Sequence, residues 1–398
     1  MGWRKKTIDD VPVSGRRVFL RVDFNVPLEG GRIVDDRRIR AALPTIRRLL
    51  ACGARLVVGS HLGRPKGVEP SLSLRPIAER LEALLGQPVH FVPEVSGPAV
   101  EEAVGKLAEG AVLMLENLRF HPGEERNDPE LARQWAAWTE LYVNDAFGAS
   151  HRAHASIEAL PRMVGTAVAG YLLQRELEYL VGALENPARP FVLVLGGAKV
   201  SDKILVLENL IGRIDRLLIG GGMAYTFLRA SGREVGRSLL EPERLSVAEA
   251  ILERARALGV PVELPQDHVV ARALDDPEPP RIASDSIPDD YMGLDIGPQT
   301  AARYAALLRE ARTVLWNGPM GVFEVPRFAT GTQAVAQALA EATRGGAITI
   351  VGGGDSAAAL DRLGLAEAVS HLSTGGGAAL ELLEGRQLPG LLALQGVS

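Results

Sequence analysis

Cysteine is nearly absent from this chain, which excludes two kinds of structural cross-link. The single Cys52 excludes an intrachain disulfide and a metal site built from several cysteine thiolates. No apolar run approaches the roughly 20 residues that span a bilayer. The first ten residues are polar and charged, which is not typical of a secretion signal. We therefore expect a cytoplasmic protein with no membrane partner.

Lysine is also scarce, since only six of the 44 basic residues are lysine. Two of these six, Lys199 and Lys203, lie four residues apart in one glycine-led segment. Arginine and lysine differ in shape and hydration, so they are not interchangeable at a binding site. We interpret both lysines as residues that stand where arginine would not serve.

The charge distribution favours a small anionic ligand over nucleic acid. The net charge is −5, which argues against a general nucleic-acid binder. The first 64 residues nevertheless hold 14 Lys and Arg against 6 Asp and Glu, a net of +8. A solvated charged face would explain the same count, so charge alone does not decide between the two interpretations.

Alternating short β-branched runs and amphipathic stretches predict an α/β protein. A chain of 398 residues is too long for one hydrophobic core, so we expect two doubly wound parallel-sheet domains. Helices are predicted between the strands, and residues 275–280 read as an acidic, proline-rich surface loop. The predicted strands are 17–22, 55–59, 89–92, 111–115 and 141–144, then 191–195, 216–219, 261–264, 313–316 and 347–351.

The predicted domains are residues 1–170 and 187–387, joined by a helix over 171–186. That connecting stretch has a helical pattern and ends at Asn186-Pro187. No long exposed apolar stripe is evident, so we expect a monomer.

Polar segments follow the predicted strands of the first half. They are DFNVP at 23–27, HLGRP at 61–65, ENLRF at 116–120, and NDAFG at 144–148 followed by HRAH at 151–154. The carboxyl ends of parallel strands share one edge of a sheet, where open α/β folds bind ligands. If these ends are neighbours, one basic pocket forms from Arg38, Arg64, Arg119, Arg152 and His61.

Such a pocket suits a small phosphorylated acid, because guanidinium groups bind phosphate and carboxylate bidentately. Asp23 and Asn25 are placed to bond a substrate hydroxyl. Each arginine taken alone is more often a surface residue, and four at successive strand ends favour the pocket. His151 and His154 leave a metal pair open, which no nearby carboxylate or cysteine at ligand spacing supports.

Glycines gather at the strand-to-helix turns of the second half. The segments are GGAKVSDK at 196–203, GGG at 220–222, GGGDS at 352–356 and TGGG at 374–377. Glycine lets backbone N–H groups approach phosphate oxygens at a helix N-terminus. Neither a Walker A motif nor a dinucleotide fingerprint occurs. We expect Lys199 and Lys203 to reach a polyphosphate, Asp355 to hold Mg²⁺, and Glu324 to bond a ribose hydroxyl.

Together the segments resemble the phosphoglycerate kinase family along essentially the whole chain. The resemblance rests on ten motifs in the family's order: DFNVP, HLGRP, LENLRF, NDAFG-ASHRAH, GGAKVSDKI, GGGMA, LDIGP, WNGPMGVFE, GGGDS and STGGGAALELLEG. It implies two Rossmann-like domains joined by a helical hinge, with residues 388–398 packed back on the first. It implies a phosphotransferase of glycolysis that transfers a phosphoryl group reversibly from 1,3-bisphosphoglycerate to Mg-ADP, giving 3-phosphoglycerate and ATP, once the hinge closes.

The resemblance also assigns the site residues. Arg38, Lys199 and Lys203 would be catalytic. The phosphoglycerate site would comprise Asp23, Phe24, Asn25, Arg38, His61, Leu62, Gly63, Arg64, Arg119 and Arg152. The nucleotide site would comprise Lys199, Lys203, Gly293, Asn317, Glu324, Gly352, Gly353, Gly354, Asp355 and Ser356, with Asp355 holding Mg²⁺ through the nucleotide.

Three rival hypotheses stay open at this point. One is a two-domain kinase for a different phosphorylated acid, which a substrate panel would separate. Another is a catalytically silent relative kept as a scaffold, against which the intact Arg38, Lys199, Lys203 and Asp355 argue. The third is a dehydrogenase, which an absence of NAD binding would dismiss.

Overall fold

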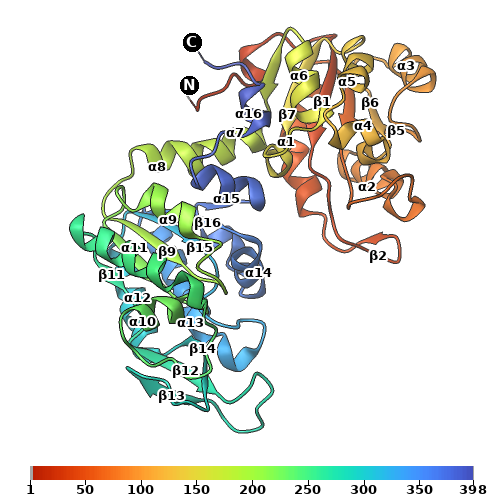
Figure 1. Ribbon diagram of the computed structural model, residues 1–398. Helices are drawn as coiled ribbons and strands as arrows, with labels where there is room; N and C mark the ends of the chain where they lie inside the picture. Colours follow the sequence, from red (N-terminus) through yellow and green to blue (C-terminus); the bar gives the residue numbers. More distant parts are fainter. Residues whose placement is uncertain (1–2, 398) are drawn as a thin grey trace. The chain divides into compact units, whose positions relative to one another are not determined.

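Contacts divide the chain into two compact units, each an α/β fold built on a parallel sheet (Figure 1). The structure is a computed structural model and describes residues 3–397. Met1, Gly2 and Ser398, which fall in the predicted ranges 1–170 and 388–398, lie outside the described residues. The first unit extends to Glu178 and takes up the chain again at Gln387, and the second runs from Tyr179 to Arg386. The predicted fold class is confirmed.

A six-stranded parallel sheet forms the centre of the first unit. Its strand order is β5-β6-β4-β1-β7-β8. The strands are β1 (Arg17–Val22), β4 (Arg55–Gly59), β5 (Val89–Val92), β6 (Val112–Leu115), β7 (Leu141–Asp145) and β8 (Ala167–Ala169), and a hairpin of β2 (Leu28–Glu29) and β3 (Arg32–Ile33) follows β1. We did not predict β8, because three small residues carry no periodicity to detect.

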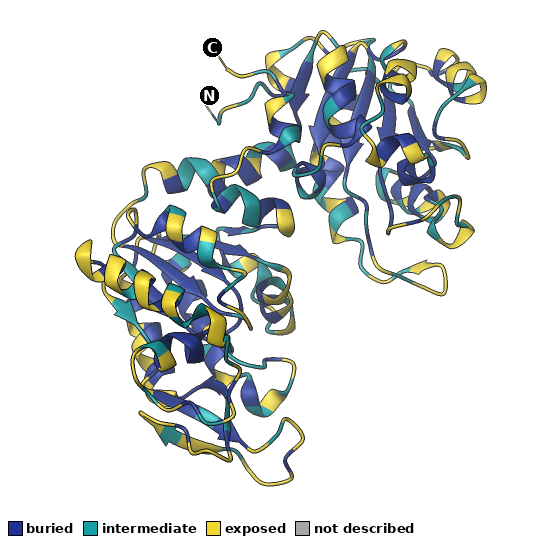
Figure 2. Ribbon diagram, viewed as in Figure 1, coloured by how far each residue is buried: buried dark blue, intermediate teal, exposed yellow. Residues whose placement is uncertain are grey.

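Strand β1 shows how the sequence covers this sheet on both faces. Val18, Leu20 and Val22 share a core with the apolar faces of α1 and α2, while the ring of Phe19 packs against Trp135 of α5 at 5.6 Å. A strand that is buried on both sides reads as a near-continuous apolar run. Figure 2 shows that the strands of both parallel sheets are largely buried. The helices of this unit are α1 (Arg37–Ala51), α2 (Arg75–Leu85), α3 (Pro98–Gly105), α4 (Pro122–Glu125), α5 (Pro129–Ala136), α6 (Leu160–Met163), α7 (Tyr171–Leu177) and α16 (Pro389–Leu392).

The C-terminal segment completes the first unit. The Lys6 N–H donates to the Gln395 carbonyl at 2.9 Å, and the Gln395 N–H donates to the Ala167 carbonyl at 3.0 Å. At Gly390 the N–H donates to the Ser150 carbonyl at 2.9 Å. An added Cβ there would lie 2.9 Å from Ser150 Cα, so this close approach requires glycine.

The second unit has its own six-stranded parallel sheet, in the order β11-β10-β9-β15-β16-β17. Counted along the chain, this is the 3-2-1-4-5-6 order, in which ligands bind where the strand order reverses. The strands are β9 (Phe191–Leu195), β10 (Arg216–Ile219), β11 (Val262–Glu263), β15 (Thr313–Asn317), β16 (Ile348–Gly352) and β17 (His371–Leu372). The helices are α8 (Ala183–Glu185), α9 (Ile204–Leu210), α10 (Met223–Ala230), α11 (Leu245–Ala257), α12 (Pro298–Glu310), α13 (Thr330–Arg344), α14 (Gly354–Arg362) and α15 (Gly377–Leu383).

An antiparallel sheet that we did not predict lies beside the parallel one. Its strands are β12 (Asp267–Ala271), β13 (Arg281–Ser284) and β14 (Met292–Ile296), paired in the order β13-β12-β14. The sequence hides these strands because β13 is largely exposed and β14 contains both Gly293 and Asp295. The predicted loop at 275–280 connects β12 to β13.

The predicted helix over 171–186 is present but irregular. Helix α7 runs into a π-helical segment at Glu178–Gly182, and α8 follows directly. The contacts divide the chain inside this stretch, between Glu178 and Tyr179. No helix within residues 3–397 is long and apolar enough to cross a membrane.

Candidate active site

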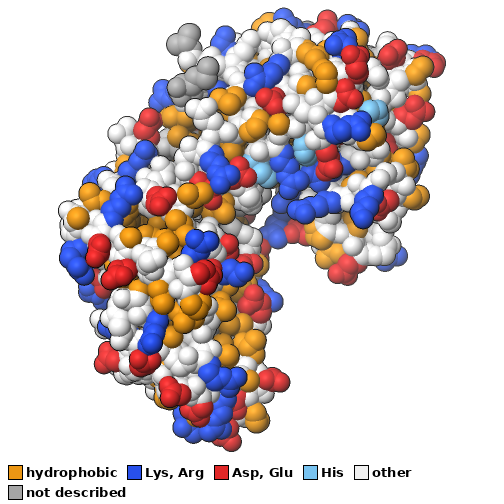
Figure 3. All heavy atoms as spheres, in the orientation of Figure 1, with side chains coloured by type: hydrophobic (Ala, Val, Ile, Leu, Met, Phe, Trp, Pro, Cys, Tyr) orange, Lys and Arg blue, Asp and Glu red, His pale blue; other side chains and the backbone are white. Residues whose placement is uncertain are grey.

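The polar segments of the first unit follow β1, β4, β6 and β7, as predicted. These four strands are hydrogen-bonded neighbours in one parallel sheet, so their carboxyl ends lie along one edge. Figure 3 shows Lys and Arg side chains gathered beside histidines on this unit. The edge therefore carries a basic surface suited to an anion.

Hydrogen bonds join several predicted substrate residues to one another. Arg38, in the first turn of α1, donates to the Asp23 carboxylate at 2.8 Å. The Asn25 side-chain oxygen accepts the Gly63 N–H at 2.9 Å, and Arg119 donates to the Gly63 carbonyl at 2.6 Å. Three strand ends, those of β1, β4 and β6, are thus linked through the backbone of Gly63.

His61 is held neutral by its surroundings. It is 5% exposed, and its Nδ1 lies 3.2 Å from the guanidinium of Arg21. Burial and then Arg21 lower the pKa of His61 well below its usual value. Arginine only donates, so Nδ1 accepts this bond and the ring proton resides on Nε2. His61 can therefore offer an N–H donor to a ligand without carrying charge.

Arg21 is a residue that our sequence reasoning missed. It lies inside β1 with no exposed surface, where it donates to the Ser156 hydroxyl at 2.8 Å and lies 3.8 Å from the buried Glu124 carboxylate. Glu124 in turn accepts the Ser156 N–H at 2.9 Å. The available signal was a single charge inside an apolar strand, since a buried charge persists only when it is paired.

Burial and mutual repulsion perturb the other basic groups of this edge. Burial and then Arg21 lower the pKa of Arg119 to about 10. Burial followed by the charges of Arg119 and Arg21 lowers the pKa of His154 to about 3. Among residues 3–397 no group of three or more His, Cys, Asp or Glu is placed to hold a metal. The positive field that disfavours a proton on His154 also disfavours a cation.

The remaining substrate residues differ in exposure. Arg64 is exposed, and Arg152 is half-buried with its Nε 3.2 Å from the His151 ring. Phe24 and Leu62 are buried, so their backbones rather than their side chains face the edge. The Phe24 N–H donates to the Ser60 hydroxyl at 2.9 Å, and Asn117 bonds both the N–H and the carbonyl of Leu62.

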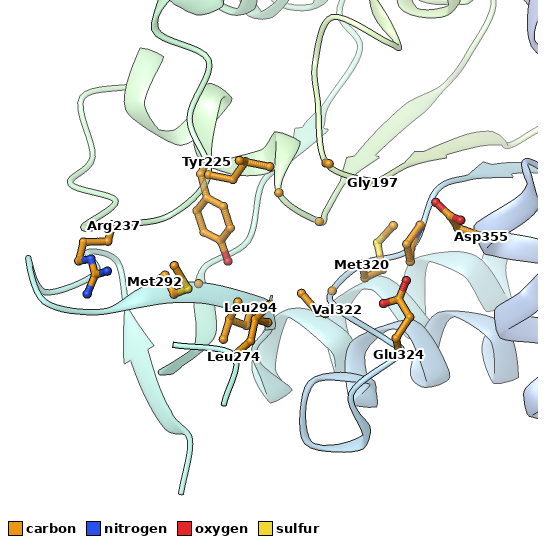
Figure 4. A pocket seen from close by; sticks show the side chains of 17 residues that line it. Gly197, Tyr225, Arg237, Leu274, Met292, Leu294, Met320, Val322, Glu324 and Asp355 are labelled. Carbon is orange, nitrogen blue, oxygen red and sulfur yellow. The ribbon is translucent and has the colours of Figure 1, made fainter. Parts of the chain in front are cut away.

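A pocket of about 430 Å³ opens in the second unit, within the range of small-molecule sites. Its walls come from the turns after β9, β10 and β15 and from β14, where the strand order reverses. Of the predicted residues, Gly293, Glu324 and Asp355 line it. Figure 4 shows the carboxylates of Glu324 and Asp355 at one end and Arg237 at the other.

Most of the pocket surface is apolar, and this was not predicted. The apolar side chains that line it are those of Tyr225, Leu239, Leu274, Met292, Leu294, Pro319, Met320 and Val322. Leu239 and Leu274 are 50% and 48% exposed, so both present apolar surface at the pocket.

Gly293 is required by the packing of this pocket. A Cβ at this position would lie 1.9 Å from the hydroxyl of Tyr225. The Gly293 N–H donates to the buried Ser238 hydroxyl at 2.9 Å. The predicted role of Gly293 therefore has a steric basis, since any other residue would displace the tyrosine.

A second cluster gathers predicted phosphate ligands. Lys203 donates to the side-chain oxygen of Asn317, and a Cβ at Gly352 or Gly353 would lie 3.3 or 3.4 Å from the Asn317 amide nitrogen. Burial lowers the pKa of Lys203, and the nearby carboxylates of Asp202 and Asp355 oppose that effect. Lys203, Asn317 and the glycine turn at 352–353 therefore lie close together beside the start of α14.

The other predicted nucleotide residues divide between exposed and supporting positions. Lys199, Gly354 and Asp355 are exposed, and Asp355 lies in the first turn of α14. Ser356 has no exposed surface and accepts the Gly318 N–H at 2.7 Å, so it supports the turn after β15. A buried hydroxyl committed to the backbone fits a supporting position better than a ligand contact.

Comparison with known proteins agrees with this geometry. The sequence profile of the family Phosphoglycerate kinase matches residues 8–386. Phosphoglycerate kinases from Chloroflexus aurantiacus and Chloroherpeton thalassium are 57% and 55% identical, over 98% of this chain and 99% of each relative. The solved structure of phosphoglycerate kinase from Coxiella burnetii has a TM-score of 0.91 at 41% identity, covering 98% of both chains.

These matches extend over nearly the whole chain and include both candidate sites. They confirm the predicted activity, a phosphotransferase that transfers a phosphoryl group between 1,3-bisphosphoglycerate and ADP in glycolysis with a carboxyl group as acceptor. The chain belongs to the phosphoglycerate kinase family.

Proposed function

We propose that the basic edge of the first unit binds 3-phosphoglycerate or 1,3-bisphosphoglycerate. The observation that supports this most strongly is the set of hydrogen bonds that ties Arg38, Asp23, Asn25 and Arg119 to one edge. Arg64, Arg119 and Arg152 would fix the phosphate far from the reacting atoms. Neutral His61 would donate Nε2–H to the substrate, and Asp23 and Asn25 would bond its hydroxyl.

We propose that the pocket of the second unit binds ADP or ATP. The apolar walls would hold the base, Glu324 would bond the ribose, and the cluster around Lys203 and Asn317 would hold the phosphates. Asp355 has the hard oxygen donors that Mg²⁺ prefers and lies beside that cluster, so its carboxylate fits the ion that accompanies the nucleotide. Bound there, Mg²⁺ would neutralise phosphate charge.

The proposed mechanism is electrostatic. The transition state of phosphoryl transfer spreads negative charge over a nearly free phosphoryl group. Arg38 and Lys203 would neutralise that charge in the reacting complex, with Lys199 assisting. The attacking oxygen is already ionised, so no general base is needed. The reaction also requires the two ligands to meet and water to be excluded, for which we propose closure about the connecting helix. A cytoplasmic monomer remains our expectation.

The decisive experiment measures ATP formation from ADP, Mg²⁺ and enzymatically generated 1,3-bisphosphoglycerate. We expect robust activity, and Arg38→Ala to lower kcat at least roughly 10³-fold while ADP affinity stays nearly unchanged, because the guanidinium acts on the moving phosphoryl group. The exposed neighbour Arg37 provides the matched control, Arg37→Ala, which should retain activity.

Two results would contradict this proposal. A loss below tenfold in Arg38→Ala would remove Arg38 from catalysis. No activity in a folded, nucleotide-binding protein would mean that the site is retained without its chemistry, as in a scaffold.

A further inference from the structure

Glu241 is bonded to the segment that carries both candidate phosphate-binding lysines. Its Oε2 accepts the backbone N–H of Val200 at 2.6 Å and that of Ser201 at 3.2 Å. Its Oε1 accepts the Ser201 hydroxyl at 2.7 Å. One carboxylate therefore holds the two residues that follow Lys199 and lie just before Lys203.

The held segment makes other backbone bonds at its two ends, where the Gly197 N–H donates to the Pro319 carbonyl at 2.9 Å and the Lys203 N–H to the Val200 carbonyl at 2.8 Å. Helix α9 begins at Ile204, and its N-cap residue Lys203 has no side-chain capping bond. Backbone N–H groups ahead of a helix have no partner within the helix. Val200 is fully buried, whereas Ala198 and Lys199 are exposed. Glu241, which lies 40 residues from Ser201 along the chain, supplies the acceptor for the N–H groups of Val200 and Ser201.

Glu241 is in turn fixed to the wall of the nucleotide pocket. Its N–H donates to the buried Thr226 hydroxyl in α10 at 3.2 Å. Leu239, two residues earlier, lines the pocket, and a Cβ added to Gly222 would lie 2.9 Å from its side chain. The backbone that carries the carboxylate is therefore bonded to α10.

We propose that Glu241 is a positioning residue for the nucleotide phosphates. By fixing residues 197–203 it places Lys199 and Lys203 before the ligand arrives, so less ordering is needed on binding. Its negative charge also lies near Lys199. The inference rests on the proposed phosphate-binding role of the two lysines.

The test compares ADP with adenosine, which has no phosphates. In Glu241→Ala we expect the Kd of ADP to rise about tenfold, the effect of losing bonds to a charged acceptor. The Kd of adenosine should change less than about twofold, because the apolar walls remain. Calorimetry for ADP and NMR titration for adenosine provide both values. The matched control is Glu243→Gln, two residues away and exposed, which should bind both ligands normally.

Milder variants keep the test informative if Glu241→Ala fails to fold. Glu241→Gln retains one acceptor oxygen, and Ser201→Ala removes only the hydroxyl bond, so each should weaken ADP binding by about threefold. Their effects should not be additive in the double variant, since both act through one contact.

Three outcomes separate the possibilities. Weaker ADP binding with unchanged adenosine binding supports the inference. Equal weakening of both ligands, or a lower Tm with normal binding, overturns it and leaves a structural role only. If Lys203→Ala also leaves ADP affinity intact, the proposed phosphate site itself fails, which is a different result from failure of Glu241 alone.

Discussion

The two candidate binding sites are built from different kinds of residue, although each lies at the carboxyl edge of a parallel sheet. The first relies on charged side chains, supported by a buried layer of Arg21, Ser156 and Glu124. The second has apolar walls and glycine turns, with charged side chains at the two ends of its pocket, Glu324 and Asp355 at one and Arg237 at the other. A small, highly charged acid offers little surface to bury, whereas a nucleotide offers a base. The ligand's chemistry thus explains the contrast.

The largest expected effect on the comparison between the units is a loss of stability on replacing Arg21. Replacing it with methionine leaves Glu124 buried without a cation, so the free energy of unfolding should fall by about 3–5 kcal/mol. The matched variant in the second unit is Arg216→Met, whose pair with Glu263 is partly exposed and should cost about 1 kcal/mol or less. Urea unfolding measures both.

A double variant checks the physical reason. Arg21→Met with Glu124→Gln removes the unpaired charge as well, and should recover part of the lost stability. Equal losses for Arg21→Met and Arg216→Met would show that the buried layer of the first unit is not special.

A smaller effect is expected at Lys203 in the second unit. Its side chain is half-buried and donates to Asn317, and a planar guanidinium differs from a compact ammonium in shape and hydration. We expect Lys203→Arg to lower kcat about hundredfold, comparable to losing one preorganised donor. Steady-state kinetics would measure it, with the exposed Lys106→Arg as control. If Lys203→Arg turns over at the wild-type rate, the interpretation that arginine cannot replace this lysine is wrong.

The smallest expected effect is a pH dependence of stability, which arises from a feature that the two units share. Burial raises the pKa of Asp145 in the first unit and of Asp295 in the second to about 7. Each accepts N–H groups at a helix start, from Leu172 and Leu173 in α7 and from Gly331 in α13. Both units therefore contain a buried aspartate with a raised pKa at a helix start.

The sign of the pH effect follows from the raised values. The folded protein binds these protons more tightly than the unfolded chain, so the stability is fully present below about pH 4 and is lost as pH rises through about 7. Asp145→Asn and Asp295→Asn should each flatten this decline by about 1 kcal/mol or more between pH 5 and 8. Urea midpoints at both pH values would measure it. Unchanged slopes would contradict the raised pKa values.

The difference between the charged edge of the first unit and the apolar pocket of the second also explains which site residues could be predicted from the sequence. The strands at 17–22 and 55–59 and the arginines after them were predictable, because apolar runs and charges at strand ends are conspicuous. Tyr225, Met292 and Val322 were not, since an apolar pocket wall has the same composition as a core. Arg21 and Glu241 act through partners over 100 and about 40 residues away, a relation that no local pattern contains.

The return of residues 387–397 to the first unit has a consequence for biosynthesis. Chains are made from the N-terminus, and domains generally fold as units as they emerge. Here the β8 edge and the Ser150 turn of the first unit receive Gln395 and Gly390 only after the entire second unit has been made. The growing chain must therefore carry the first unit incomplete until the second unit and residues 387–397 have both been synthesised.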